Sequence, residues 1–214
     1  MAYYRLSLTK LPVTNIIKLC NVFIFILVSP LLLLLKIFHI PLRLKEVFYE
    51  ELEFIHQSYE ILSEIEVRKN ELEKIGFIWL GQYEVKGGPY ETCCGLMLLK
   101  PYIGCAIIKT KTKETINTSV EMVTISKEGV ILNTVNTKPG LLSNFPLQMI
   151  NIRVNQDTSF EKMIEIHRDN LYRNIEQQFR IPLNNATDII NVYKDSYRKN
   201  IQYWSKKGYL TRYE

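Results

Sequence analysis

The sequence predicts an α+β domain attached to a membrane, on the strength of three observations. An uncharged apolar run fills residues 19–35, residues 77–136 alternate between apolar and polar side chains, and two amphipathic stretches follow in residues 158–207. Strands followed by helices are typical of an α+β fold. We therefore expect an N-terminal transmembrane helix, a long acidic helix, and an antiparallel meander of about five strands covered by two C-terminal helices.

The apolar run is bounded by Lys18 and Lys36, and its neighbours extend the predicted membrane helix to residues 16–38. Thirteen Val, Ile, Leu or Phe side chains in the run favour insertion by about 4–8 kcal/mol. Pro30 kinks a membrane helix without excluding it. No small-residue cleavage site follows the run, so we interpret it as a retained single-pass anchor. The predicted anchor residues are Lys18, Leu19, Phe23, Phe25, Pro30, Leu35 and Lys36.

Charge is distributed unevenly along the chain. Residues 1–45, which include a basic N-terminal segment at 1–15, hold six basic and no acidic side chains, whereas residues 46–75 hold nine glutamates. Three basic residues lie near each end of the apolar run, so charge alone leaves the sidedness open. The odd number of thiols after the run (Cys93, Cys94 and Cys105) favours a reducing, cytoplasmic location for the soluble domain. No dense basic stripe is present, which argues against nucleic-acid binding.

The acidic residues 42–75 are expected to form one amphipathic juxtamembrane helix. Its apolar side chains recur at steps of three and four residues, the helical period. This stripe is too short for a convincing coiled coil, so packing on the chain's own domain is the favoured interpretation. The side chains of the stripe are Phe48, Leu52, Ile55, Tyr59, Leu62 and Ile65.

Residues 76–140 are expected to form the antiparallel sheet. Short turns, among them the glycine pair at Gly87 and Gly88, separate segments rich in β-branched and aromatic residues, and short turns join antiparallel neighbours. The predicted strands are 77–85, 90–100, 103–111, 118–126 and 130–136.

Residues 156–214 are expected to supply the helical part of the same domain. A capping-box pattern beginning at Thr158 predicts a helix to about residue 179, and a second helix runs from about 186 to 207 and ends at Gly208. The second helix carries aromatic and basic residues, including Tyr197 and Trp204. Such a mixture suits either packing on the sheet or contact with an anionic membrane surface.

No residue pattern indicates a catalytic, cofactor or metal site, and no cofactor is predicted. His167, on the apolar face of its helix, is the weak candidate for an acid or base, against the alternative of a core histidine. The glycine pair joins two strands and lacks the features of a phosphate loop. Residues 134–140 form a polar strand end where a small ligand would fit, but a plain solvated loop is the favoured interpretation.

Three segments, residues 72–83, 120–136 and 165–168, resemble uncharacterised bacterial membrane-anchored α+β proteins. In those proteins a helix-to-strand element precedes a pair of strands and a helix that bears a histidine. The resemblance implies a domain outline over residues 72–168 and no particular activity.

The leading functional hypothesis is a membrane-anchored interaction or sensory module that binds a protein partner or ligand near the lipid bilayer. One alternative is an enzyme that acts on a membrane-associated substrate with His167 as acid or base. A further alternative is a peripheral lipid-binding domain that uses the C-terminal helix. The sequence leaves the oligomeric state open.

Overall fold

The computed structural model describes residues 3–7, 10, 43–57, 61–112, 115–137 and 145–213. The chain divides into two compact units, which are described separately. The central unit comprises residues 51–138 and 147–197, and the terminal unit comprises residues 1–50, 139–146 and 198–214.

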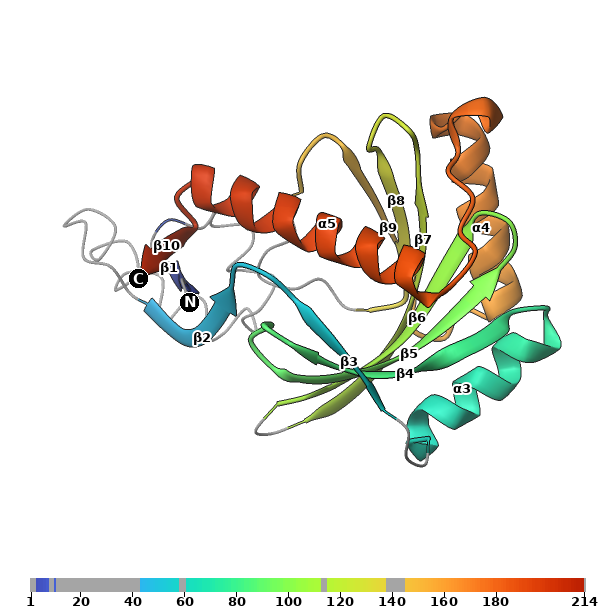
Figure 1. Cartoon of the computed structure of the whole chain (residues 1–214), viewed down its shortest axis with the longest axis horizontal. Helices are drawn as coiled ribbons and strands as arrows, with labels where there is room; N and C mark the ends of the chain where they lie inside the picture. The colour runs from blue at the N-terminus through green and yellow to red at the C-terminus, as the bar shows by residue number, and fades with distance from the viewer. Residues whose placement is uncertain are drawn as a thin grey trace. The chain divides into compact units, whose positions relative to one another are not determined.

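A seven-stranded sheet forms the central unit, with the order β3-β4-β5-β6-β7-β8-β9 (Figure 1). Every neighbouring pair is antiparallel except β8 and β9, which run parallel. The strands are β3 (Glu53–Gln57), β4 (Ile78–Lys86), β5 (Glu91–Leu99), β6 (Ile103–Lys111), β7 (Ile116–Ile125), β8 (Ile131–Val135) and β9 (Met149–Arg153).

The predicted five-stranded meander is confirmed as β4 to β8, with bounds that differ from the prediction by two residues at most. Two further strands extend it. β3 adds to one edge by pairing with β4, and β9 adds to the other edge by pairing in parallel with β8. Neither addition follows from local turn signals. β3 and β4 are separated in the sequence by α3, and a parallel neighbour such as β9 is reached only through a longer connection.

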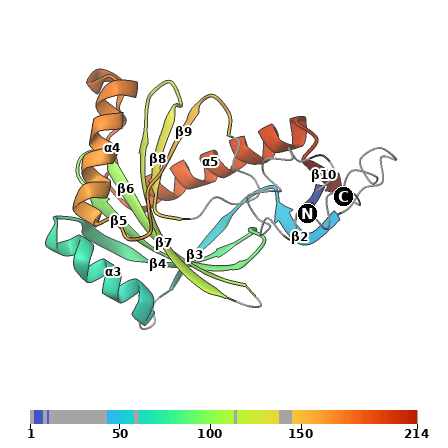
Figure 2. The same cartoon turned by 180° about the vertical axis from the view of Figure 1, so that it is seen from behind.

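Helices cover both faces of this sheet. Helices α3 (Ser63–Lys74) and α4 (Phe160–Asn174) lie on one face, and the first part of α5 (Ala186–Lys206) lies on the other (Figure 2). A short 3-10 helix, η2 (Gln177–Phe179), follows α4. The predicted pair of C-terminal helices is thus present, but α4 ends at Asn174 and not near residue 179, and the two helices cover opposite faces of the sheet where one shared face was expected. The core below α3 and α4 consists of fully or nearly buried apolar side chains, including Ile65, Leu72, Met97, Met122 and Met163.

Local capping explains where the helices begin and end. Gly76 has a φ of +97°, its N–H donates to the Glu73 carbonyl, and the Phe77 N–H donates to the Leu72 carbonyl. This pair of bonds is the Schellman arrangement, which requires a left-handed residue and so favours glycine. At the start of α4, the Ser159 hydroxyl accepts a hydrogen bond from the Lys162 N–H at 3.3 Å.

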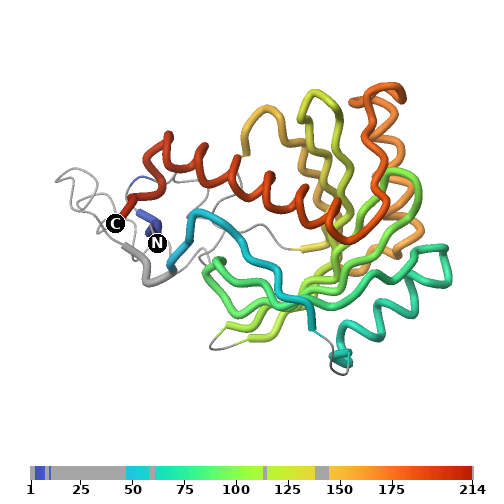
Figure 3. Tube along the Cα trace, in the orientation of Figure 1, coloured from blue at the N-terminus to red at the C-terminus, as the bar shows by residue number. Residues whose placement is uncertain are grey.

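The terminal unit contains a three-stranded sheet in the order β10-β1-β2. Its strands are β1 (Tyr3–Ser7), β2 (Arg43–Tyr49) and β10 (Leu210–Tyr213), and both pairings are antiparallel. The two chain ends therefore meet in one sheet, as the trace in Figure 3 shows. Tyr4, Leu6 and Leu210 are buried in this unit.

The predicted single helix over residues 42–75 is wrong. β2 and β3 occupy its first half, and among the described residues of this stretch the α-helix is confined to α3. Spacing of three and four residues is the helical period, but the same apolar residues also serve strands whose partners lie far away in the sequence: β2 pairs with β1, and β3 with β4. Ladder hydrogen bonds outweigh the weak local helix preference here.

The prediction that residues 156–214 belong to one helical part is also corrected. α5 passes from the central unit into the terminal unit, and residues 210–213 form β10 instead of continuing as helix or loop. Gly208, with a φ of +73°, ends α5 as expected and lets the chain reverse.

The predicted membrane helix at 16–38, with all seven of its anchor residues, lies outside the described residues. Among the residues that the structure describes, no helix has both the length and the apolar composition that a membrane crossing requires.

Candidate functional site

His167 extends from α4 into the core between this helix and the sheet and is fully buried, at 0% exposure. Its Nε2 lies 3.0 Å from the Thr124 hydroxyl oxygen on β7, and its Nδ1 lies 3.0 Å from the Thr134 hydroxyl oxygen on β8. Both ring nitrogens are therefore engaged by threonines, and α4 is tied to two neighbouring strands.

The hydrogen-bond network around His167 assigns its tautomer. The Thr124 hydroxyl donates its one proton to the Tyr102 carbonyl at 2.9 Å, so its oxygen accepts a bond from the imidazole Nε2–H. Nδ1 then accepts from the Thr134 hydroxyl. Burial, with a smaller contribution from the Arg168 charge, lowers the pKa of His167 to about 3. This is the geometry of a neutral core histidine that has no open face for a substrate.

The polar residues at the end of β8 are used internally. Besides Thr134, the Asn136 side-chain oxygen accepts a hydrogen bond from the Val120 N–H, and the Asn136 N–H donates to the Val120 carbonyl at 3.2 Å. Asn136 thus extends the pairing of β7 and β8 beyond the regular ladder. The rest of the predicted ligand loop, residues 138–140, lies outside the described residues.

A second group of polar side chains lies on the opposite face of the sheet, which we call the polar cluster. Its members come from three adjacent strands, and the registers Glu121–Val135–Arg153 and Asn133–Asn151 place them on one face. The Asn133 amide nitrogen donates to the Asn151 side-chain oxygen at 3.3 Å. The polar cluster consists of Glu121, Asn133, Asn151 and Arg153.

Helix α5 reaches this cluster, because the Tyr193 hydroxyl donates to the Glu121 main-chain carbonyl at 3.3 Å. The Arg153 guanidinium donates to the Thr137 carbonyl at 3.5 Å. Asn133 is 4% exposed, and its side-chain oxygen has no hydrogen-bond partner among the described residues.

The electrostatics of the cluster centre on Glu121. Burial raises the pKa of its carboxyl to about 7, and the Arg153 charge opposes that rise. Burial also lowers the pKa of Arg153, against the favourable field of Glu121. With a pKa near 7, the carboxyl of Glu121 changes charge in the neutral range.

Little in the amino-acid sequence indicates this cluster. Glu121 is the only charged residue in the predicted strand 118–126. An isolated charge within a strand is a sequence signal that could have indicated the cluster. Arg153 and Asn151 lie on β9, which was not predicted. Their proximity to Glu121 depends on the parallel pairing of β8 with β9.

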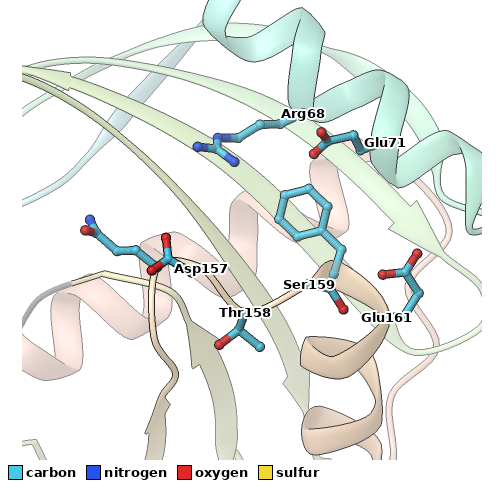
Figure 4. A pocket seen from close by; sticks show the side chains of 8 residues that line it. Arg68, Glu71, Asp157, Thr158, Ser159 and Glu161 are labelled. Atoms are coloured by element: carbon cyan, nitrogen blue, oxygen red, sulfur yellow. The ribbon is translucent and has the colours of Figure 1, made fainter.

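A groove of about 320 Å³ lies where α3 faces the start of α4 (Figure 4). Arg68 and Glu71 come from α3, while Asp157, Thr158 and Glu161 come from the loop and first turn of α4. Three carboxylates face one guanidinium, so the first turn of α4 is not a convincing anion site. The Ser159 hydroxyl there already caps the helix.

The glycine pair and the cysteines have structural roles. Gly87 has a φ of +96° in the β4–β5 turn, and its carbonyl accepts a hydrogen bond from the Tyr197 hydroxyl at 3.0 Å. A side chain there would collide with the Glu51 carbonyl. Cys93, Cys94 and Cys105 are free, and burial raises the pKa of each thiol.

The aromatic residues of α5 are also accounted for by packing. Tyr193 and Tyr197 bond to main-chain carbonyls, Trp204 is buried, and its ring lies 6.2 Å from that of Phe145. Within the described residues, no three His, Cys, Asp or Glu side chains converge as metal ligands.

A scan against protein-family models and searches of curated proteins and solved structures found no match to this chain. The resemblance to bacterial membrane-anchored proteins therefore stays a prediction.

Proposed function

We propose that the chain is a membrane-attached interaction or sensory module, whose α+β domain binds a partner or ligand close to the bilayer. The observation that carries this proposal is the uncharged apolar run at residues 19–35 between Lys18 and Lys36. An insertion free energy of about 4–8 kcal/mol is sufficient to hold a protein at a bilayer.

The geometry of His167 supports binding over catalysis through this residue. A general base has to come within hydrogen-bond reach of the proton that it removes. His167 is buried, and both of its nitrogens bond to threonine hydroxyls. The alternative of a peripheral lipid-binding domain also loses support, because the aromatic side chains of α5 have partners within the protein.

The polar cluster supports a sensory form of the module. Glu121 and Arg153 are the two charged members of the polar cluster, and each is half-buried. Charged groups in such a setting respond strongly to a neighbouring charge or to a proton. A ligand with a cationic or hydrogen-bond-donating group would favour ionised Glu121.

Fractionation of cells that express the full-length chain tests the membrane attachment. We expect the protein in the membrane fraction, released by detergent and not by high salt. Replacing Leu27 and Leu33 with lysine introduces two charges at about 2.5–3.5 kcal/mol each, so that variant should become soluble or be degraded. Val67→Lys, at a 60% exposed position of α3, is the matched control and should stay with the membrane. Wild-type protein in the soluble fraction without detergent would refute the proposal.

A further inference from the structure

We propose that β1 and β2 lie on the same side of the bilayer, so that the chain between them enters and leaves the membrane on one side. The apolar run then does not make the single crossing that its length suggests. This inference rests on the proposed membrane attachment and specifies its topology.

The register of the terminal sheet carries the inference. β1 and β2 pair antiparallel, with Tyr3 opposite Tyr49, Tyr4 opposite Phe48 and Ser7 opposite Arg43. Paired Cα atoms lie about 4.5–5.5 Å apart, so the chain leaves β1 and returns to β2 at one place. β1 is also held on its other edge, where it pairs with β10 and the Ser7 N–H donates to the Tyr209 carbonyl at 2.8 Å.

A single crossing would separate these strands. A helix over residues 16–38 would rise about 34 Å and place its two ends on opposite sides of the hydrocarbon. To restore the pairing of Ser7 with Arg43, residues 8–15 and 39–42 would then have to run back through the lipid.

Reach alone does not forbid that path, because these twelve residues extend to about 41 Å. The main-chain N–H and C=O groups of these twelve residues make a path through the lipid unfavourable. Each unsatisfied N–H or C=O in hydrocarbon costs several kcal/mol, so a few such groups already exceed the insertion energy of about 4–8 kcal/mol. A single crossing and a paired β1–β2 sheet therefore exclude each other.

The charges around the run agree with a same-side arrangement. A single-pass segment usually has an excess of basic residues on its cytoplasmic flank. Here the two flanks carry three basic residues each, and residues 1–45 contain no acidic residue. Equal basic flanks are expected when both lie on the same side. The flanking residues are Arg5, Lys10 and Lys18 before the run and Lys36, Arg43 and Lys45 after it.

Tag accessibility in sealed vesicles distinguishes the two topologies. The full-length chain carries one epitope tag at each terminus, and protease is added to right-side-out or inside-out vesicles. We expect both tags to be lost in the same vesicle orientation. Loss of the two tags in opposite orientations would overturn the inference and leave the membrane attachment standing. Protein absent from the vesicles would overturn the proposed function, and this inference with it.

Cross-linking then tests the strand pairing in the membrane-bound protein. Tyr3→Cys combined with Tyr49→Cys places two thiols at register partners, and we expect a disulfide on mild oxidation. Tyr3→Cys with Phe48→Cys is the matched control, because residues 48 and 49 point to opposite faces of β2. Equal cross-linking of the two pairs, or none of either, would overturn the inference.

Discussion

The two sheets of this chain are built from different kinds of contact. In the seven-stranded sheet, β4 to β8 follow one another along the chain, and helices cover both faces. In the three-stranded sheet, β1 contacts strands that begin about 40 and 200 residues later. Pairing strands that are neighbours in the sequence closes a short loop at a small cost in chain entropy. Pairing distant segments closes a longer loop at a larger cost. The three-stranded sheet therefore depends on contacts between distant segments from the start of its formation.

The two sheets also differ in how their charged side chains are surrounded. The seven-stranded sheet places charged groups inside one covered face, at Glu121 and Arg153. The three-stranded sheet places tyrosines around a guanidinium: the Tyr3 and Tyr213 rings stack at 5.4 Å, and the Arg5 guanidinium lies 5.7 Å and 5.6 Å from their centres. Tyrosine and arginine are common where protein meets the headgroup region of a bilayer.

The largest loss of stability is expected from a substitution in the core of the seven-stranded sheet. His167→Ala removes the imidazole that joins α4 to β7 and β8 and leaves two threonine hydroxyls without their partner. We expect the free energy of unfolding to fall by about 3–5 kcal/mol, measured by urea denaturation in detergent. His56→Ala is the control, because His56 is exposed on β3 and should change the free energy by less than about 1 kcal/mol. A stable His167→Ala protein would contradict the structural role.

A smaller and more local effect is expected in the three-stranded sheet. Leu6 is 2% exposed on the central strand β1, and Leu6→Ala should destabilise the terminal unit by about 2–4 kcal/mol. Because the contacts divide the chain into two units, amide exchange should accelerate in β1, β2 and β10 and remain slow in β5 and β6. Acceleration throughout the molecule would show that the two sheets unfold together.

The smallest effect concerns the polar cluster and depends on pH. The ordinary pKa of Glu121, 4.5, is raised to about 7 in the native state, so native protein keeps a proton that unfolded protein has lost. This contribution to stability is complete below pH 4.5 and disappears as the pH rises through 7. His167 acts in the opposite sense, since its pKa of about 3 lies below 6.5 and its contribution is lost as the pH falls.

Glu121→Gln mimics the protonated carboxyl, so the variant should not lose this contribution to stability as the pH rises. Relative to wild type, the variant should gain about 1–2 kcal/mol between pH 4.5 and pH 8, a range that allows for the partial exposure of Glu121. Melting temperatures measured across that range test the difference, with the exposed Glu66→Gln as control. A constant offset between Glu121→Gln and wild type would mean that Glu121 does not titrate there.

Much of the central unit was predictable because its signals are local. The turn glycines mark the ends of β4, and Ser159, Gly76 and Gly208 mark helix ends through bonds to nearby main-chain groups. A short turn fixes which strands are neighbours. His167 could be identified as the one histidine on an apolar helix face, but its threonine partners, 43 and 33 residues away, could not.

The α+β class, the five-stranded meander and the two C-terminal helices follow from the amino-acid sequence, because hydrophobic period, turns and caps act within a few residues. Long-range pairing made strands of residues 43–49 and 53–57, set β9 parallel to β8, and placed β1 between β2 and β10. A strand satisfies its main-chain groups only through a partner. Where that partner is distant in the chain, the local pattern cannot indicate which strand it is.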